Sequence, residues 1–518
     1  MAAMSISLEH VAAELPARYP GPGGAVAVLR EGAVVLRHAW GFANAERRLA
    51  FTPATLFRIC SITKQFVCAL LLDRVPDPTA LEPGLRRRLP KLSARTPSAL
   101  HLAHNQSGLR DYWAVAMLHG SPVEAPFGDD EAARVIGGTR SLQFDPGTRY
   151  SYTNQNFRLL SELLEESEGR TLAELLRRHV FDRAGMPSAL LAADTRALAG
   201  GTEGYEGSQA AGFRAAENRV FWTGDAGIAA SLDDMIAWER HIDATRDDPA
   251  SLYRRLSAPV AFANGSPAAY GFGLGRATEF GRAVTGHGGA LRGWRSHRLH
   301  VAEERISVVV LFNHMGDTQA AALDLLAAAL GEARGATELE PRKSLLCGAY
   351  LDPETGLAAR VDEAGPGRLR LRFGHSPDRL EIRPDGSAGN ARTTLRRTAG
   401  GVWMDRPAEN QSGLLLPNEG PPPADAAGRY RCDELDAELT IADAGGALYG
   451  AFSGFLGRGR MELLEPAGRD VWALPMPRAL DHTPPGDWTL AARREGGRVA
   501  AIEVGCWLAR RLTYRRIG

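Results

Sequence analysis

Strand-like segments near both ends of the first 330 residues constrain the fold most, because a long helical stretch separates them. Residues 25–29 and 34–40 form a predicted hairpin around a turn at Arg30-Glu31-Gly32. Four further strands are predicted over 270–275, 283–288, 294–300 and 306–312. The two strands of the hairpin and the four later strands can all bury their apolar faces if they belong to one sheet. The pattern therefore predicts an α+β domain, in which both ends complete one antiparallel sheet and helices pack on it.

Helical segments are predicted before, between and after these strands. A short amphipathic helix covers 8–15, and a closing helix covers 318–330. Another helix begins near Ser61, and helical, loop-rich sequence continues to about residue 240. The apolar residues of the Ser61 helix that are expected to face a core are Ile62, Phe66, Val67, Leu70 and Leu71.

The character of the chain changes after about residue 335, where short alternating strands and Gly/Asp/Pro turns dominate. Residues 348–354 (GAYLDPE) resemble residues 428–434 (GRYRCDE), and the proline-rich run 417–423 between them is typical of a linker. Chance similarity remains an alternative for so short a repeat. We expect two small antiparallel β-barrel domains that hide their strand edges. The predicted domain boundaries are 1–334, 340–416 and 425–518.

Charge and composition exclude several classes of partner. Acidic and basic residues number 61 each, so no global field would attract nucleic acid or an acidic membrane. The first 20 residues lack the pattern of a signal peptide, and no run of 18 apolar residues predicts a spanning helix. Five scattered cysteines are typical of reduced thiols. These features predict a cytoplasmic protein that binds neither nucleic acid nor membrane.

The first chemical motif is Ser61-Ile62-Thr63-Lys64. On a helix, residues three apart share a face, so an amine at Lys64 can reach the Ser61 hydroxyl and remove its proton. The chain has only three lysines among 61 basic residues, which makes Lys64 informative, because a desolvated lysine can lose its proton and an arginine cannot. The alternative is an N-cap serine followed by a surface lysine.

The second motif is Tyr152-Thr153-Asn154. A phenol beside a lysine ionises more readily and can carry protons between a nucleophile and a leaving group. Asn154 could hydrogen-bond both Lys64 and a substrate carbonyl. The alternative is a polar loop that follows the turn at Asp145-Pro146-Gly147.

The third motif, Thr285-Gly286-His287-Gly288-Gly289, lies on a predicted strand. Its glycines would let a substrate backbone lie against the strand edge. His287 could polarise the substrate or relay a proton, although a lone histidine is more often structural.

The order and spacing of the three motifs resemble those of the serine β-lactamase and penicillin-binding-protein superfamily. Many members carry lysine in the third motif, and the histidine form is similar to the class C-type esterase and D-aminopeptidase branch. The resemblance covers about residues 20–330. Three further segments support it: Asn105-Gln106-Ser107-Gly108-Leu109, Gly224-Asp225-Ala226-Gly227-Ile228 and Tyr270-Gly271-Phe272-Gly273-Leu274.

This resemblance implies a serine hydrolase that needs no cofactor. Its implied catalytic residues are Ser61 as nucleophile, Lys64 and Tyr152 as base and proton donor, and His287 as an assisting group. Asn154, Gly288 and Gly289 would contact the substrate. Backbone N–H groups of Ser61 and of a residue just after His287 would hold the oxyanion.

A β-lactamase-like domain followed by two barrels resembles the bacterial D-aminopeptidases. In that family a loop of the last barrel reaches the active site, and residues 477–488 match it in place and proline content. The resemblance implies that Asp481 pairs with the free ammonium of a small D-amino-acid peptide, amide or ester. An ordinary solvated loop carboxylate is the alternative for Asp481. The resemblance further implies a homodimer and acylation by β-lactams.

Other candidates carry less chemistry. Arg295 follows the third motif and either braces the pocket or forms a structural salt bridge. No metal is expected, because no spacing typical of metal ligands accompanies the histidines. Two other functions remain open: an esterase or D,D-peptidase with the same site, and a non-catalytic scaffold that binds ligands.

Overall fold

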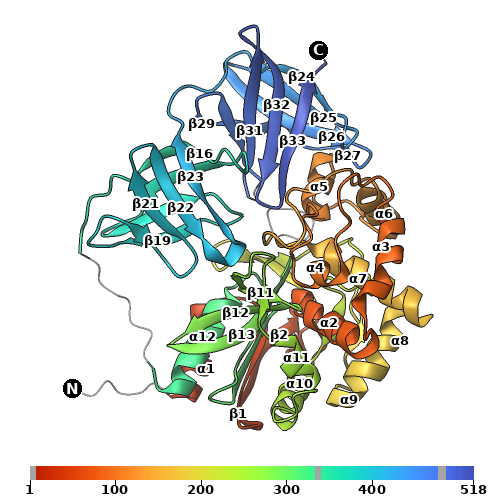
Figure 1. Cartoon of the computed structure of the whole chain (residues 1–518). Coiled ribbons are helices and arrows are strands. Elements are labelled where there is room, and N and C mark those ends of the chain that lie inside the picture. The colour runs from red at the N-terminus through yellow and green to blue at the C-terminus, as the bar shows by residue number, and fades with distance from the viewer. Residues whose placement is uncertain (1–6, 333–339, 477–485, 518) are drawn as a thin grey trace.

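The computed structural model describes residues 7–332, 340–476 and 486–517. Figure 1 shows an N-terminal part of helices and a sheet, with two β-rich units above it. The first β-rich unit lies over the sheet, and the second lies over the helical side. The predicted α+β architecture is confirmed.

One eight-stranded antiparallel sheet forms the centre of the N-terminal part. In spatial order its strands are β11 (Tyr270–Gly271), β12 (Leu274–Glu279), β13 (Arg282–Leu291), β14 (Trp294–Val301), β15 (Ile306–Phe312), β1 (Gly23–Arg30), β2 (Ala33–Asn44) and β3 (Leu49–Ala50). Strand β1 pairs with β15, with Gly24 opposite Phe312 and Arg30 opposite Ile306. Both ends of this part therefore complete one sheet, as predicted.

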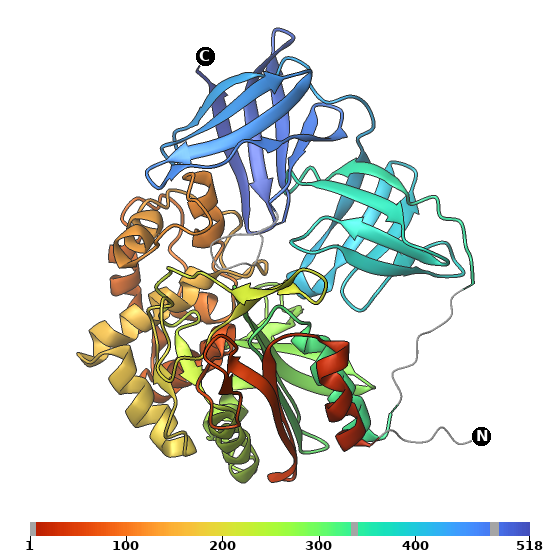
Figure 2. The same ribbon diagram turned by 180° about the vertical axis from the view of Figure 1, so that it is seen from behind.

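Helices cover both faces of this sheet (Figures 1 and 2). Helices α1 (Leu8–Arg18) and α12 (Thr318–Leu330) pack on one face, where Val26 and Val310 are buried. The next residues along β1, such as Ala25 and Ala27, belong to the core on the other face, because side chains alternate along a strand. That core also contains the helices of the middle of the chain: α2 (Thr63–Arg74), α3 (Glu82–Arg88), α4 (Ala99–Ala103), α5 (Tyr112–Leu118), α6 (Asp129–Gly137), α7 (Asn154–Glu168), α8 (Leu172–Leu176), α9 (Asp182–Ala184), α10 (Leu232–Ala244) and α11 (Leu252–Leu256).

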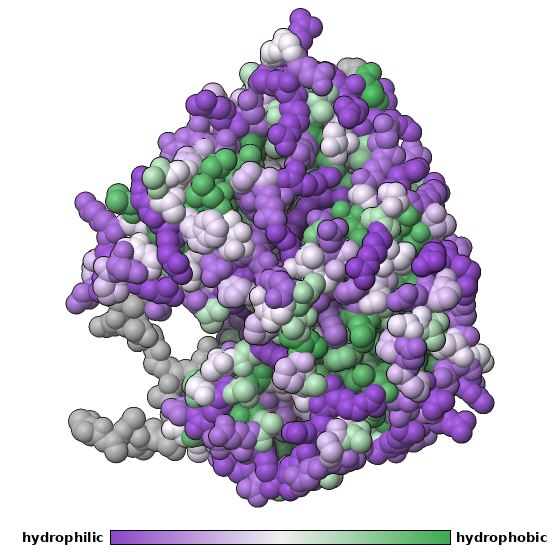
Figure 3. Space-filling model, viewed as in Figure 1, coloured by the Kyte–Doolittle hydropathy of each residue, from purple (hydrophilic) through white to green (hydrophobic). Residues whose placement is uncertain are grey.

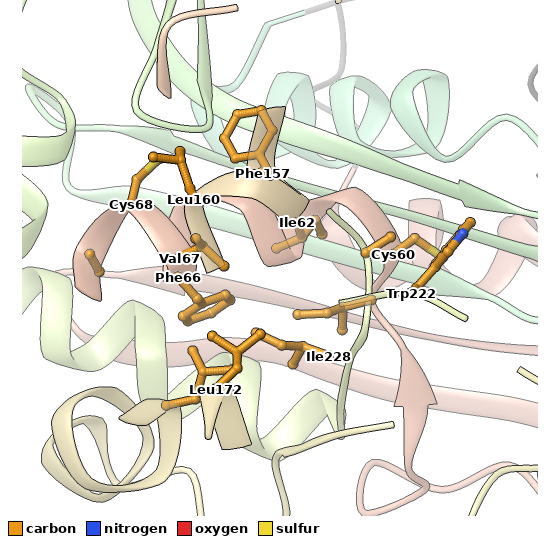
Figure 4. Close-up of a cluster of buried hydrophobic side chains, with 14 of the residues drawn as sticks. Cys60, Ile62, Phe66, Val67, Cys68, Phe157, Leu160, Leu172, Trp222 and Ile228 are labelled. Carbon is orange, nitrogen blue, oxygen red and sulfur yellow. The ribbon is translucent and has the colours of Figure 1, made fainter. Parts of the chain in front are cut away.

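Helix α2 is the central helix of that core. Every residue from Thr63 to Leu71 is buried, including four of the five predicted apolar residues, and the fifth, Ile62, is buried just before the helix. Figure 4 shows Phe66 and Val67 of α2 among Phe157, Leu160 and the other labelled apolar side chains of this cluster. The segment that begins at Ser61 is therefore held from all sides, which suits a group that must keep a fixed position.

Short strands complete the N-terminal part. They form one three-stranded and two two-stranded sheets: β4 (Phe57–Arg58) with β8 (Ile228–Ala230) and β5 (Leu190–Leu191), β6 (Tyr205–Ser208) with β7 (Gly212–Ala215), and β9 (Val260–Ala261) with β10 (Pro267–Ala268).

The first β-rich unit is a closed antiparallel barrel. Its strands are β16 (Gly348–Leu351), β17 (Ala358–Glu363), β18 (Arg368–Arg372), β19 (Asp378–Ile382), β20 (Ala388–Gly389), β21 (Thr394–Thr398), β22 (Gly401–Arg406) and β23 (Gln411–Pro417). Closure leaves no free edge, as the predicted barrel requires.

The second β-rich unit is a half-barrel. Its strands are β24 (Gly428–Cys432), β25 (Ala437–Ala444), β26 (Ala447–Gly454), β27 (Gly457–Arg458), β28 (Glu462–Leu463), β29 (Glu465–Gly468), β30 (Val471–Leu474), β31 (Trp488–Glu495), β32 (Arg498–Cys506) and β33 (Ala509–Arg516). In the described residues the order runs from β27 to β29 without closing. The β27 edge lies on the N-terminal part, since a Cβ on Gly120 would be 2.4 Å from the Gly457 carbonyl oxygen. Because the described strands of this unit do not close into a barrel, contact with the N-terminal part covers its β27 edge instead.

The predicted repeat is visible in the first strand of each unit. Gly348 and Gly428 share an unusual φ, +150° and +152°. Two residues later, the hydroxyls of Tyr350 and Tyr430 each donate to the carbonyl four residues upstream, at 2.9 and 2.7 Å. The two units therefore begin with the same local structure.

Helix α5 belongs to two cores at once. Tyr112, Trp113 and Val115 pack in the N-terminal core, whereas Met117 and Leu118 pack in the core shared by the β-rich units. The second unit therefore packs directly against α5, the helix that begins beside the candidate site.

Neither a spanning helix nor a disulfide occurs in the ranges given above. No helix there is long and apolar enough to cross a membrane. All five cysteines are free, and only Cys347 is exposed. Figure 3 shows a largely hydrophilic face, on which apolar residues form small separate groups.

Candidate active site

Ser61 lies on a single 3₁₀ turn, η1 (Cys60–Ile62), immediately before α2. Strand β13 packs directly against this turn. A Cβ on Gly289 would be 2.5 Å from the Ile59 carbonyl oxygen and 2.9 Å from the Cys60 Cβ, so only glycine fits there. The Ser296 hydroxyl donates to the same Ile59 carbonyl at 2.8 Å. The third motif thus fixes the nucleophile against the sheet.

Backbone strain accompanies this fit. Cys60 has a φ of +52°, a left-handed conformation that a residue with a side chain rarely adopts. Two other non-glycine residues near the site share it, Asn105 at +53° and Phe272 at +51°. Conformations of this kind persist only where the surroundings enforce them, and they concentrate at functional sites.

Asn105 positions the second motif. Its carbonyl accepts the Ser151 N–H at 3.0 Å, and its Oδ1 accepts the Thr153 N–H at 3.2 Å. The Asn156 amide donates to the same Oδ1 at 3.0 Å. These contacts hold the segment on both sides of Tyr152, which explains why the Asn105–Leu109 segment accompanies the motif.

Lys64 is fully buried, and its amine is held by three oxygens. Nζ lies 3.0 Å from Ser61 Oγ, 2.9 Å from Asn154 Oδ1 and 2.7 Å from the Asp225 carbonyl oxygen. The two carbonyl oxygens can only accept, so two N–H bonds of the amine point at them. In a neutral amine the remaining position is the lone pair, which then faces Ser61 Oγ. This geometry suits removal of the serine proton.

Asp111 fixes which end of the Asn154 amide faces Lys64. The Asn154 backbone N–H and Nδ2 donate to Asp111 Oδ2 at 2.6 and 3.1 Å, which leaves Oδ1 for the lysine. The other oxygen, Oδ1, accepts the Trp113 N–H at 3.0 Å. Burial raises the pKa of Asp111 to about 6, against the lowering effect of these donors, so the group is still mainly a carboxylate at neutral pH.

The second β-rich unit supports Asp111 through its backbone. The Asp111 N–H donates to the Leu508 carbonyl at 2.9 Å. Beside it, Arg110 donates to the Arg510 carbonyl at 2.9 Å and to Glu434 Oε1 at 3.0 Å. A chain of contacts therefore runs from this unit through Asp111 and Asn154 to the amine of Lys64.

The carbonyl of Asp225 is held equally firmly. Its side chain accepts the Tyr112 hydroxyl at 2.5 Å and the Thr223 N–H at 3.0 Å. Asp225 is fully buried, so these bonds leave its backbone little freedom. The Gly224–Ile228 segment thus supplies one of the three acceptors around Lys64.

Tyr152 and His287 complete the cluster. Lys64 Nζ lies 4.9 Å from the centroid of the Tyr152 ring, and this ring lies 6.0 Å from that of His287. His287 Nδ1 contacts the Gly288 carbonyl, which can only accept, so Nδ1 carries the proton. Nε2 then accepts from the Tyr270 hydroxyl at 3.1 Å.

His287 acts as a neutral group in this arrangement. Burial, and next the positive charge of Lys64, lower its pKa to about 3. It therefore differs from a lysine, which would carry a positive charge at this position. The sequence did not single out Tyr270 as its partner, although Tyr270 lies in one of the supporting segments.

Arg295 is not brought into the cluster. Its Nη1 donates to the carbonyls of Leu291 and Trp294 at 3.0 and 2.9 Å. Arg295 is opposite Phe312, which packs on the α12 face, whereas the next residue, Ser296, faces Ile59. Strand alternation therefore directs Arg295 to the face of the sheet that is remote from Ser61.

Of the remaining predicted site residues, the structure describes Gly288 but not Asp481. A Cβ on Gly288 would be 3.2 Å from His297 Nδ1, so Gly288 faces away from Ser61 and offers its backbone alone. Asp481 lies outside the described residues. Within the described ranges, no group of three or more His, Cys, Asp or Glu residues could hold a metal ion.

The arrangement can carry out acyl transfer. A serine hydroxyl, an amine directed at it, a phenol beside the amine and backbone N–H groups on a glycine-rich strand are the parts that this chemistry needs. The sequence missed Asp111, because an aspartate before a helix is ordinarily an N-cap.

Replacing Asp111 by asparagine tests the contact chain. The new amide would place a donor against the two Asn154 donors, so the Asn154 amide would rotate and direct its own donor at Lys64. We expect kcat to fall about 100-fold with little change in KM. Steady-state kinetics on a chromogenic acyl substrate measures both constants.

The matched control is Asp317→Asn. Asp317 caps α12 and accepts the Ala320 N–H at 2.9 Å, on the remote face of the sheet. This variant should keep the kcat of the unmodified protein. If both variants keep it and melt at the same temperature, Asp111 is only a helix cap.

Comparisons with known proteins agree with this geometry. Residues 8–333 match the family model described as beta-lactamase, and residues 340–515 match the one described as D-aminopeptidase, domain B. The chain is 58% identical to a D-aminopeptidase of Gluconobacter oxydans and 47% identical to one of Brucella melitensis, each over 99% of both chains.

A solved structure shows the same fold at low identity. The octameric penicillin-binding protein homologue from Pyrococcus abyssi superposes with a TM-score of 0.54 and 20% identity, over 87% of this chain and 98% of that one. Family models and relatives together span nearly the whole sequence. The chain therefore belongs to the D-aminopeptidase family, whose N-terminal domain is a β-lactamase-type serine hydrolase domain.

Proposed function

We propose that the protein is a D-stereospecific aminopeptidase, which releases small N-terminal D-residues from peptides, amides and esters through an acyl-enzyme on Ser61. The observation that carries the proposal is the position of the Lys64 amine, between two acceptors and the Ser61 hydroxyl. The relatives' name, D-aminopeptidase, supports the substrate class.

The proposed reaction has two halves. Ser61 Oγ attacks the substrate carbonyl carbon while its proton moves to Lys64, and N–H groups of Ser61 and of a residue just after His287 hold the oxyanion. Tyr152, beside Lys64, delivers a proton to the leaving amine as the C–N bond breaks. Water then attacks the ester carbon and gives up a proton to the same pair. The bond from this carbon to Ser61 Oγ breaks, Oγ takes a proton from the pair, and the D-amino acid leaves.

Neutral His287 has a limited part in this scheme. Because its Nδ1 proton and Nε2 lone pair are both engaged, it orients Tyr270 and the strand rather than supplying charge. Asn154 Oδ1 accepts from Lys64, and one N–H of its Nδ2 donates to Asp111, so the second N–H of Nδ2 would donate to the substrate carbonyl.

We assign the requirement for a free amine to Asp481. A carboxylate there would pair with the substrate α-ammonium. This role fits a division into a catalytic domain, 1–334, a first barrel, 340–416, and a second β-rich domain, 425–518, that carries the loop.

The direct test compares D-alanine p-nitroanilide with its L-form and its N-acetylated form. We expect rapid release only from the D-form with a free amine. Asp481→Asn should raise KM for that substrate about 10- to 100-fold, the range for a lost charge-assisted contact, and should leave N-acetyl turnover unchanged. Equal rates on the free and N-acetylated substrates would refute the ammonium–carboxylate pair and favour an esterase or D,D-peptidase.

The control variant is Asp433→Asn, an exposed carboxylate of the same half-barrel. It should match the unmodified protein on all three substrates. A change equal to that of Asp481→Asn would indicate a general effect of removing charge from this unit.

We further propose that the protein acts in the cytoplasm as a homodimer, and that β-lactams acylate Ser61. Free cysteines and balanced charge support the first part, and the resemblance to penicillin-recognising hydrolases supports the others. Light scattering during gel filtration should give twice the chain mass of 55.7 kDa. The intact mass of the protein after incubation with a penicillin should rise by the mass of one inhibitor molecule.

A further inference from the structure

A polar cavity of about 290 Å³ lies where the N-terminal domain meets both β-rich units. Arg149 lines it from the N-terminal domain, Glu354 and Thr355 from the first barrel, and Arg510 and Arg511 from the half-barrel. The proposed reaction uses none of these residues. The N-terminal domain also contributes Gln143, Phe144, Asp145 and Thr148, so three arginines and two carboxylates line the cavity. Arg149 pairs with Glu354 and Arg511 with Glu503, which leaves Arg510 as the cation to be explained.

Arg510 is the unusual member of this set. Its side chain is 2% exposed, and its guanidinium lies 4.0 Å above the Trp507 ring. Nε donates to the Trp507 carbonyl at 3.1 Å, but Nη2 is buried without a hydrogen-bond partner. Among the described residues, no carboxylate forms an ion pair with Arg510. A buried donor without an acceptor is costly, and a buried charge without a partner is more so.

The acidic groups that act on Arg510 hydrogen-bond to other residues. Asp352 accepts from Thr355 Oγ1 at 2.7 Å and from Gln411 Nε2 at 3.0 Å. Glu409 accepts from Arg406 at 3.0 Å through Oε1, while its Oε2 is buried without a hydrogen-bond partner. The negative charge of both carboxylates raises the pKa of Arg510, but neither forms an ion pair with it among the described residues.

The pKa of Arg510 is lowered overall. Burial, and then the positive charge of Arg149, lower the pKa of Arg510 to about 10, so the side chain stays charged at neutral pH. Arg149 itself is paired with Glu354. Arg510 therefore lines the cavity as a charged group with no ion pair among the described residues, and a second cation, Arg149, lines the same cavity.

We propose that this cavity binds a small anion, a phosphate or a carboxylate, that accepts from Arg510 and Arg149. A planar guanidinium offers paired donors that match the oxygens of either group. The bound anion would join the segment just before Tyr152 to both β-rich units. It would therefore stabilise the assembled chain and the backbone that carries the phenol.

Thermal unfolding and calorimetry at constant ionic strength test the proposal. Inorganic phosphate and acetate are titrated separately up to 10 mM, with sodium chloride as the balancing salt. Saturable binding of either anion, with a melting temperature that rises with its concentration, is the expected result. The anion that binds identifies whether phosphate or carboxylate is the preferred group. Absence of saturable binding for both would overturn the proposal, since ordered water would then suffice for Arg510.

Variants locate the effect. Arg510→Met keeps an apolar cover on Trp507, removes the buried charge, and should abolish the anion-dependent rise. Arg149→Gln leaves Arg510 in place and should weaken binding about 10-fold. Arg396→Gln, an exposed arginine on the first barrel, should behave as the unmodified protein. An anion-dependent rise that survives in both Arg510→Met and Arg149→Gln would place the anion elsewhere and overturn the proposal.

Discussion

Ser61→Ala should lower kcat for D-alanine p-nitroanilide by about 10⁴-fold or more, the scale on which loss of a serine nucleophile acts. No other group lies where Ser61 Oγ meets the Lys64 amine at 3.0 Å, so the covalent route has no substitute in the described part of the site. Release of p-nitroaniline measures the loss. The structure predicts little change in the melting temperature, because the hydroxyl is small and lies at the edge of the buried cluster.

The sharpest control is the adjacent residue. The Cys60 thiol donates to the Arg58 carbonyl at 3.2 Å, and Cys60→Ser preserves that contact. This variant should keep kcat within about 10-fold of the unmodified value. If Cys60→Ser loses activity and Ser61→Ala keeps it, the thiol is the nucleophile. If neither change matters, the non-catalytic scaffold becomes the better interpretation.

Lys64→Arg should lower kcat about 1,000-fold or more. Arginine keeps a positive charge but does not give up its proton, so it cannot act as the base toward Ser61. Lys64→Met, which removes both charge and base, should lose as much activity. Rapid-quench measurement of the acyl-enzyme would place the loss in the acylation step.

The control for this prediction is Lys91→Arg, because Lys91 is exposed. It should leave kcat and the melting temperature unchanged. Substantial activity in Lys64→Arg, with none in Lys64→Met, would contradict the account. It would show that Lys64 serves as a fixed cation and that another group accepts the serine proton.

Local sequence patterns predicted the parts of this structure that depend on neighbours along the chain. The strands over 306–312 and the helix over 318–330 have the bounds predicted for them. The three motifs also meet in space, since Lys64 contacts both Ser61 and Asn154 and lies beside Tyr152. Such motifs are readable because each one combines reactive groups with a spacing that the local element dictates.

The parts that could not be predicted depend on residues far apart in sequence. Asp111 reaches Asn154 only because the helices they begin pack together, and the contact of Asp111 with Leu508 joins segments nearly 400 residues apart. Helix α5 held one usable signal: it is apolar on all sides, as a helix shared by two cores must be. Arg295 shows the converse, because nearness in sequence to His287 did not place it on the same face.

The most direct measurement of the central claim is mass spectrometry of the protein quenched during turnover of a slow D-alanyl ester. Trypsin should release residues 59–64, which hold Ser61 together with Cys60 and Thr63, so fragmentation must locate the adduct. The account predicts one D-alanyl group on the oxygen of Ser61, absent in Ser61→Ala and formed more slowly in Lys64→Arg. An adduct on any other residue, or rapid turnover with no adduct at Ser61, would contradict it.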